Sequence, residues 1–334
     1  MTADKLKEIL TKIKNVKICM IGDICLDAYF HADMSLSALS RETPHYPLPV
    51  TKEVYSLGGG GNVLANLDSL GVGKVIPVSI ISDDWRGMLV SKCLEDINAD
   101  ISGIIIDNSR VTPCYCKPMR HGISDTVYED PRIDFENRQP VCKETETRIL
   151  EALKTAAEKA DIIAVCDQNE FGVINPSVIS KLGEIGKNKP VVVDSRDRIG
   201  LFENVIVKPN EREASKALNM NENEPEKMAV ELNAKNSAPA IITIGEKGSV
   251  WCEGGKAVRV PAVKTNGPID IVGAGDTFLA AFCAAYGAGI DGLTALEFAN
   301  LASSVTIRKT GTTGTASPDE IIKAFGFVKP GEYK

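Results

Sequence analysis

The sequence lacks several features that would identify common protein classes. It has only three histidines and no Cys-x-x-Cys pair, so no ligand set has the usual spacing of a zinc site. Its longest apolar stretch, around residues 278–285, is far shorter than the about 18 residues needed to span a bilayer. It contains neither the Gly-x-x-x-x-Gly-Lys-Ser/Thr motif of P-loop proteins nor the Gly-x-Ser-x-Gly turn of serine hydrolases.

Positive charge is also in short supply. Lys and Arg number 38 against 45 Asp and Glu, which gives a net charge of −7. This balance excludes non-specific binding to nucleic acid or to an anionic membrane surface. It leaves room for a local basic pocket around a small anion.

Nine cysteines are present, but they form no disulfide framework. Several lie inside apolar runs, such as residues 18–20, 164–166 and 281–283, and are interpreted as small buried hydrophobic side chains. Residues 3–15 have the spacing of an amphipathic helix and show no secretory pattern. These observations predict a reduced, cytoplasmic protein.

Short apolar runs alternate with helical patterns along most of the 334 residues. The runs predicted to be buried strands are 16–21, 75–81, 101–106, 162–165, 191–193, 205–207 and 240–244. The segments predicted to be helices are 61–70, 85–97, 143–159, 176–187, 211–218, 225–236, 276–288 and 293–308. This alternation predicts an α/β fold with a mostly parallel sheet and helices on both faces.

Two stretches, residues 27–56 and 111–136, interrupt this rhythm. They are rich in Pro, Tyr and charged residues and lack helical periodicity. These stretches have two interpretations. They are either extra strands that project from the main sheet and form a lid over a site, or ordinary surface hairpins.

The strongest chemical signal is the run from Asp270 to Phe278, which reads DIVGAGDTF. Small residues at 273–275 precede an apolar helix, so successive backbone N–H groups lie at a helix N-terminus and can bind an anion. The carboxylate of Asp276 beside them suits phosphoryl transfer to a hydroxyl. The alternative is a simple helix cap, which favours an acidic residue in the first turn.

Three further motifs each have a functional and a structural interpretation. Residues 58–61 are four glycines followed by Asn62, which suits either close approach to a ligand or a flexible turn with a helix cap. Asn210 and Glu213 have the spacing of a capping box, and Glu213 is also suited to holding Mg²⁺ through water. Residues 243–248 are either a loop beside a phosphate or a plain hairpin.

Taken in this order, the four motifs resemble those of the PfkB (ribokinase-like) carbohydrate kinases. The resemblance extends from about residue 16 to residue 322. It implies a ribokinase-like three-layer α/β/α fold with a small β lid. The expected organisation is a single kinase domain over residues 1–334, with lid strands from about 27–56 and 111–136.

The resemblance also implies roles for individual residues and makes ATP and Mg²⁺ the expected cofactors. Asp276 is expected to be the catalytic base, and the backbone at Gly273, Ala274 and Gly275 the anion hole. Residues expected to bind the sugar are Asp27, Gly59, Gly60 and Asn62. Residues expected around the nucleotide are Asn210, Glu213, Thr243, Gly245, Gly248 and Asn300, with Glu213 holding Mg²⁺ through water. Asp270 resembles a monovalent-cation ligand, so K⁺ is a candidate third cofactor.

Within this family, the chain is most similar to heptose-7-phosphate kinases, in the stretches 22–29, 40–50 and 132–136. The resemblance implies phosphorylation of heptose 7-phosphate at the 1-hydroxyl. Candidate cations for its phosphate are Lys117, Arg120, Arg132 and Arg41, of which Lys117 and Arg132 are favoured over ordinary surface charges. Alternatives are another acceptor (ribose, fructose, a ketose phosphate or a nucleoside) and a catalytically silent sugar-binding or nucleotide-binding regulator.

Two expectations concern the molecule as a whole. Lid strands with exposed apolar residues favour a homodimer through the lid. Some heptose-phosphate kinases carry a fused nucleotidyltransferase, and because only residues 319–334 follow Pro318, we do not expect that second activity in this sequence.

Overall fold

The computed structural model describes residues 1–97, 99–122, 126–265, 267–309 and 313–326. Its helices are α1 (Ala3–Lys12), α2 (Gly60–Ser69), α3 (Trp85–Glu95), α4 (Lys143–Lys159), α5 (Pro176–Gly186), α6 (Glu211–Leu218), α7 (Pro225–Asn236), α8 (Ala274–Gly287), α9 (Gly292–Thr306) and α10 (Pro318–Gly326). Its strands are β1 (Lys17–Gly22), β2 (Ile24–Asp33), β3 (Val50–Gly59), β4 (Lys74–Ile81), β5 (Gly103–Ile106), β6 (Cys114–His121), β7 (Val127–Glu129), β8 (Ile133–Phe135), β9 (Ile162–Asp167), β10 (Val191–Ser195), β11 (Ile206–Val207), β12 (Ala240–Thr243), β13 (Ser249–Glu253) and β14 (Lys256–Val260).

The main sheet has nine strands in the order β14-β13-β12-β11-β10-β9-β1-β4-β5. Neighbouring strands from β12 to β5 pair in parallel, whereas β13 and β14 pair antiparallel at one edge. The mostly parallel sheet predicted from the alternating pattern is therefore confirmed. The carboxyl ends of its parallel strands meet along one edge, where ligands bind in open α/β sheets.

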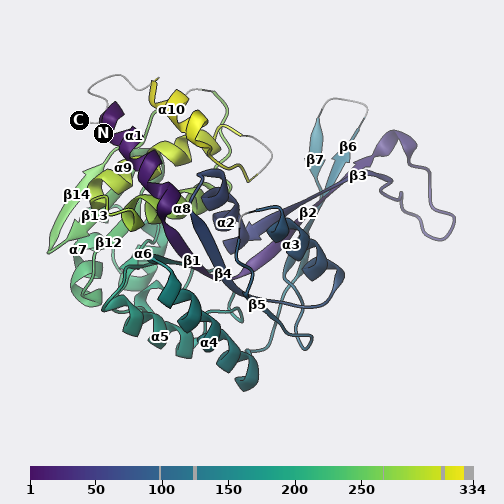
Figure 1. Cartoon of the computed structure of the whole chain (residues 1–334). Coiled ribbons are helices and arrows are strands. Elements are labelled where there is room, and N and C mark those ends of the chain that lie inside the picture. The colour runs from purple at the N-terminus through teal and green to yellow at the C-terminus, as the bar shows by residue number, and fades with distance from the viewer. Residues whose placement is uncertain (98, 123–125, 266, 310–312, 327–334) are drawn as a thin grey trace.

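Helices cover both faces of this sheet, which explains why its strands read as continuous apolar runs. Along β1, Ile18 and Met20 belong to one buried cluster, and Cys19 and Ile21 belong to the other. The first cluster packs against α1, α2, α8 and α9, and the second packs against α4, α5 and α7. Figure 1 shows α4 and α5 on the side of the sheet opposite α1 and α8.

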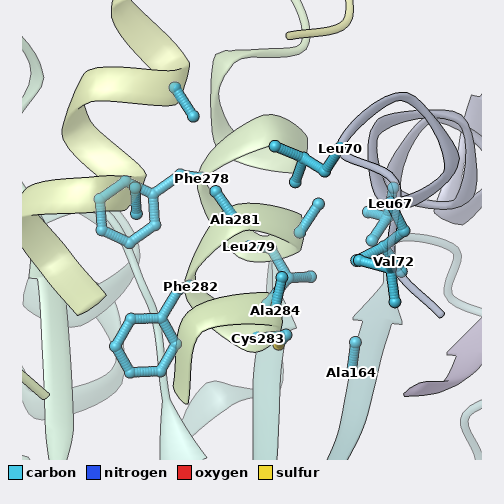
Figure 2. Close-up of a cluster of buried hydrophobic side chains, with 14 of the residues drawn as sticks. Leu67, Leu70, Val72, Ala164, Phe278, Leu279, Ala281, Phe282, Cys283 and Ala284 are labelled. Carbon is cyan, nitrogen blue, oxygen red and sulfur yellow. The ribbon is translucent and has the colours of Figure 1, made fainter. Parts of the chain in front are cut away.

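Helix α8 is the centre of the first cluster. Leu279, Phe282 and Cys283 are fully buried, and Figure 2 shows this helix packed beside Leu67 of α2 and Leu70, which directly follows α2. Each large side chain buried there contributes roughly 1.5–3 kcal/mol to folding. The N-terminus of α8 is therefore held in a fixed place at the edge of the sheet, and Asp276 is in its first turn.

The two stretches that interrupt the sequence pattern form a second sheet, in the order β3-β2-β6-β7 with β8 also paired to β6. Its strand β2 follows β1 after one residue, Asp23. The ends of the β2–β3 segment meet again where the Gly60 N–H donates to the Asp23 carbonyl at 2.8 Å. Figure 1 shows this sheet projecting from the body of the molecule.

Three elements were not predicted from the sequence. Strands β13 and β14 are an antiparallel extension of the main sheet, and α10 follows the predicted last helix. The strand predicted at 101–106 begins at Gly103. Across the described residues, none of the helices is both long and apolar enough to cross a membrane.

Candidate active site

A cavity of about 610 Å³ lies between the carboxyl edge of the main sheet and the second sheet. Most of the residues expected at the site line it, and they come from segments far apart in the sequence. They are Asp27, Gly59, Lys117, Arg132, Asn210, Glu213, Thr243, Gly245, Gly248, Gly273, Ala274, Gly275, Asp276 and Asn300. Gly60, Asn62 and Asp270 are not in the lining, although Asn62 contacts it through Asp276.

The first turn of α8 carries Asp276 into this cavity. Gly273 precedes the helix with φ of +79°, a left-handed conformation that favours glycine, and a Cβ there would lie 2.8 Å from the Asn62 amide nitrogen. The Ala274 N–H donates to the Ile271 carbonyl at 3.2 Å. The N–H groups of Gly275 and Asp276 belong to the first turn, where a helix leaves donors available for an anion.

A buried polar network fixes the carboxylate of Asp276. The Asn62 side-chain amide donates to its Oδ2 at 2.8 Å. Asn66 donates to the Asn62 carbonyl at 2.9 Å, and the hydroxyl of Thr277 donates to Asn66 Oδ1 at 2.9 Å. Because α2 and α8 are joined by this network, the carboxylate has one defined orientation toward the cavity.

The surroundings of Asp276 shift the pKa of its carboxyl group toward neutral pH. Burial raises its pKa from 3.8 to about 7. The hydrogen bond from Asn62 acts in the opposite direction, Asp194 raises the pKa further, and the positive charge of Lys208 lowers it. A carboxylate with a pKa in this range is matched to accept a proton from a hydroxyl.

An ion pair lies at the carboxyl ends of the neighbouring strands β10 and β11. Lys208 Nζ is 3.0 Å from Asp194 Oδ2, and the Lys208 side chain is only 4% exposed. Burial alone would lower the pKa of Lys208, but Asp194 and Glu213 raise it above its usual value. Lys208 therefore stays cationic in the wall of the cavity.

Asn210 and Glu213 form the capping box that their spacing predicts. The Glu213 N–H donates to Asn210 Oδ1 at 2.9 Å, and the Asn210 N–H donates to Glu213 Oε2 at 2.8 Å. Burial, with Asp194 nearby, raises the pKa of Glu213. The cap does not exclude the functional interpretation, because both residues also line the cavity.

The donors in this wall fit a magnesium ion bound largely through water. Carboxylates of Asp194 and Glu213 face the cavity, and Mg²⁺ prefers one or two such oxygens together with waters and substrate phosphates. Within the described residues, no group of three or more His, Cys, Asp or Glu side chains is arranged to hold a metal.

On the side of the second sheet, the cationic residues are already paired. Lys117 Nζ lies 3.1 Å from Asp27 Oδ1 and donates to the Tyr29 hydroxyl at 3.0 Å. Arg132 donates twice to Asp134 at 2.7 Å and lies over the ring of Tyr115. Both cations therefore carry a carboxylate partner at the cavity wall.

On the opposite side of the cavity lies the loop between β12 and β13, for which the sequence predicted either a plain hairpin or a loop beside a phosphate. It is a hairpin, and it lines the cavity. Gly248 has φ of +95°, and a Cβ there would lie 2.1 Å from the Val260 carbonyl oxygen, so only glycine fits. Asn300 donates to Ser249 Oγ at 3.2 Å and thereby holds the hairpin against α9.

Asp270 stands apart from the cavity lining. Its Oδ1 accepts from the Val272 N–H at 3.0 Å, and its own N–H donates to the Ile307 carbonyl at 2.8 Å. These contacts fix the turn before α8.

Residues 16–320 match the family model of the "pfkB family carbohydrate kinase" proteins. The chain belongs to this family. It is thus an ATP-dependent sugar kinase. The expectation of a catalytically silent regulator is set aside.

Relatives and solved structures agree with this assignment. The bifunctional protein HldE of Geobacter sulfurreducens is 29% identical over 93% of this chain and 63% of its own length. That of Geotalea uraniireducens is 30% identical over 99% of this chain and 67% of its own length. The chain thus spans about two thirds of these relatives.

Two solved kinases are similar in fold. Ribokinase of Arabidopsis thaliana, complexed with ribose and ATP, has a TM-score of 0.68 at 20% identity and covers 94% of this chain and 100% of its own. Phosphofructokinase-2 of Escherichia coli, in complex with potassium, has a TM-score of 0.70 at 18% identity and covers 93% of this chain and 99% of its own. These likenesses confirm the ribokinase-like α/β fold.

Sequence reasoning missed several residues in the wall of this kinase's cavity. Asp194, Arg196 and Lys208 belong to no local motif, because sheet pairing brings β10 and β11 together. One signal was available: Asp194 and Lys208 each follow a predicted buried strand directly. Polar residues at that position lie at the ligand-binding edge of a parallel sheet.

Proposed function

We propose that this kinase transfers the γ-phosphoryl group of ATP to a hydroxyl of a sugar phosphate, with heptose 7-phosphate and its 1-hydroxyl as the first choice. The observation that carries the proposal is Asp276 in the first turn of α8, in one cavity with the residues of both predicted ligand sides. The acceptor lies beside Asp27 and Gly59. The nucleotide lies along the loop at Gly245 and Gly248.

Asp276 acts as the base in the transfer. Its carboxylate, oriented by Asn62, takes the proton of the acceptor hydroxyl as that oxygen forms a bond to the γ-phosphorus. The bond between the γ-phosphorus and the bridging oxygen breaks, and ADP leaves with the electron pair. A pKa of about 7 lets Asp276 accept the proton near neutral pH and release it afterwards.

Charge on the transferred group is stabilised by groups fixed before the reaction. The anion hole lies at the turn of Gly273, Ala274 and Gly275, where the Ala274 N–H is already bound to Ile271 and the N–H groups of Gly275 and Asp276 are the donors offered to the phosphoryl group. Lys208 supplies a buried positive charge in the same cavity. Glu213 and Asp194 are the residues that would hold Mg²⁺, which supplies charge neutralisation for the ATP phosphates when bound. Because the groups are preorganised, little reorganisation is needed during the transfer.

The acceptor rests on resemblance and on relatives named bifunctional protein HldE. Ribose, fructose, a ketose phosphate or a nucleoside remain the competing acceptors. Coupled measurement of ADP release over a panel of these compounds, with heptose 7-phosphate included, tests the proposal. Highest kcat/KM for heptose 7-phosphate supports it; highest kcat/KM for another acceptor rejects the heptose assignment; no turnover with any of them rejects the transfer itself.

Further parts of the proposal concern organisation. We propose a single kinase domain over residues 1–334, in which the second sheet is a lid. We also propose that two copies form a homodimer through that lid and that the protein is cytoplasmic.

Potassium near Asp270 is proposed as an activator. Dependence of kcat on K⁺ at constant ionic strength, abolished in Asp270→Asn, tests that last point.

A further inference from the structure

A second cavity, of about 220 Å³, lies next to the active-site cavity. Tyr115, Gln168 and Arg196 line both, so the two spaces meet at these side chains. The nucleotide loops, including Gly245 and Gly248, line only the first cavity. The second cavity therefore extends the acceptor side of the site, away from ATP.

Three arginines from separate loops line this second cavity. Arg110 follows β5, Arg138 follows β8 and Arg196 follows β10. Loops at a distance in the sequence thus bring three guanidinium groups to one small space. The guanidinium group suits a phosphate because it donates two parallel hydrogen bonds to it.

None of these three arginines forms an ion pair within the described part of the chain. Arg110 donates to the carbonyls of Gln139 and Phe171, and Arg196 donates to the side-chain oxygen of Gln168 at 3.3 Å. By contrast, Arg86, Arg120, Arg132, Arg198 and Arg259 each pair with a carboxylate. Within the described residues, Arg41, Arg148, Arg212 and Arg308 also have no ion pair, but they do not line this cavity. What distinguishes Arg110, Arg138 and Arg196 is that all three line the same small space.

Carboxylates are present there too, but they do not neutralise these arginines directly. Asp23 accepts backbone N–H groups of Gln168, Asn169 and Val173 at 2.8–3.1 Å. Glu136 and Glu170 are exposed, and in the described residues neither is ion-paired to an arginine of the cavity. None of the three guanidinium groups is therefore held in an ion pair, although Arg110 and Arg196 already donate to neutral oxygens of Gln139, Phe171 and Gln168.

This arrangement differs from the one at Lys117 and Arg132, the cations expected from the sequence. Those two already have Asp27 and Asp134 as partners, so an acceptor phosphate beside them would compete with an existing carboxylate. At the second cavity a phosphate would displace no ion-paired carboxylate, although Asp23, Glu136 and Glu170 also line that space. The charge pattern thus favours it as the place for an acceptor's phosphate.

We propose that the second cavity binds the phosphate of a phosphorylated sugar acceptor through Arg110, Arg138 and Arg196, while the reacting hydroxyl lies at Asp276. This inference rests on the proposed function and makes it more specific. The acceptor carries its phosphate at the end opposite the reacting hydroxyl. Arg196, at the junction of the cavities, contacts the acceptor where it passes from one to the other.

Matched acceptor pairs test this proposal. ADP release is measured with ribose and ribose 5-phosphate, fructose and fructose 6-phosphate, and heptose and heptose 7-phosphate. In the pair that the enzyme uses best, we expect kcat/KM for the phosphorylated sugar to be at least tenfold higher than for the free sugar. In Arg138→Gln, that preference falls about tenfold, as the loss of a charge-assisted hydrogen bond predicts. KM for ATP stays at the wild-type value.

Arg120→Gln is the matched control, because Arg120 is 44% exposed, pairs with Asp130 and lines neither cavity. Its preference for phosphorylated acceptors should equal that of the wild type, and both variants should keep the wild-type unfolding temperature. Turnover with no phosphate preference, or equal losses in Arg138→Gln and Arg120→Gln, overturns this inference while the kinase proposal stands. Absence of turnover with every acceptor overturns both.

Discussion

Asp276, the proposed base, illustrates how catalysis and folding can make opposite demands on one residue. Its carboxylate is surrounded by protein and by Asp194, which together raise its pKa to about 7. A group whose pKa is higher in the folded than in the unfolded state makes folding less favourable as pH rises between the two values. The reactive form of the base therefore has a cost in stability.

Replacing this base separates the two effects. We expect Asp276→Asn to lower kcat by about 10²–10⁴-fold, the usual contribution of a general base, while binding of ATP persists. Because Asn carries no charge, the unfolding temperature of the variant should rise relative to wild type, and this gain should grow between pH 4 and pH 7. Kinetic assays and calorimetric scans over pH check both outcomes; unchanged turnover rejects the base assignment.

Asn62 offers a test of how the pKa of the base is set. The hydrogen bond from Asn62 lowers the pKa of Asp276, and catalysis needs the ionised carboxylate. In wild type, kcat should rise with pH through about 7. In Asn62→Ala, the same limb should move to higher pH, so the loss of activity is largest at pH 6 and smallest at pH 9. A uniform loss at all pH values would contradict this account.

At the scale of elements, the capping box of α6 joins a structural role with a proposed role at the nucleotide in the same two residues. Asn210 and Glu213 satisfy backbone donors at the helix N-terminus, and both also face the active-site cavity. Sequence spacing alone left the structural and functional interpretations open. The structure confirms the cap and also places both residues in the cavity wall, where the proposed function needs them.

A pair of substitutions separates these functions. Glu213→Gln keeps a capping box, since Gln accepts the same hydrogen bond, but removes the charge. We expect it to preserve the unfolding temperature and to raise the Mg²⁺ concentration needed for half-maximal activity. Asn210→Ala should lower stability by about 1 kcal/mol, or roughly 2 °C in Tm, through loss of the cap. Magnesium titrations and thermal unfolding of both variants give the answer; an unaltered Mg²⁺ requirement in Glu213→Gln contradicts the assignment.

Sequence patterns predicted elements and motifs well where the information was local. Buried strands such as β1 and β9, and the turn before α8, follow from runs of a few residues. The pattern did not reveal β13 and β14, because no element was assigned to 249–260 and the antiparallel pairing of these strands to the sheet edge depends on contacts that a local pattern does not show. It also missed the pairing of Lys208 with Asp194, because strand register rather than spacing brings them together.

On the scale of the whole molecule, the second sheet exposes apolar side chains away from the body. Val50, Val54, Val127, Tyr128 and Ile133 are each between 37% and 56% exposed. Exposed strands with such residues are suited to pairing with another sheet. This surface motivates the proposed homodimer.

We expect the protein to sediment as a dimer at micromolar concentration and Val54→Glu to sediment as a monomer, because a buried charge at the interface is costly. Leu201→Glu is the control, since Leu201 is 63% exposed but lies on the body, following β10. A monomeric wild type, or equal dissociation in both variants, rejects the lid interface.

The hydrogen bond between the Gly60 N–H and the Asp23 carbonyl has a consequence for protein engineering. It joins the two points where the segment 24–59 leaves and re-enters the main domain, so this segment has the topology of an insertion with closed ends. A graft from a related kinase needs to match this junction and the buried contacts that Ile24, Leu26 and Leu57 make with the main core. Exchange of acceptor preference by modular replacement of this segment, together with 114–135, is therefore a topologically simple operation on this scaffold.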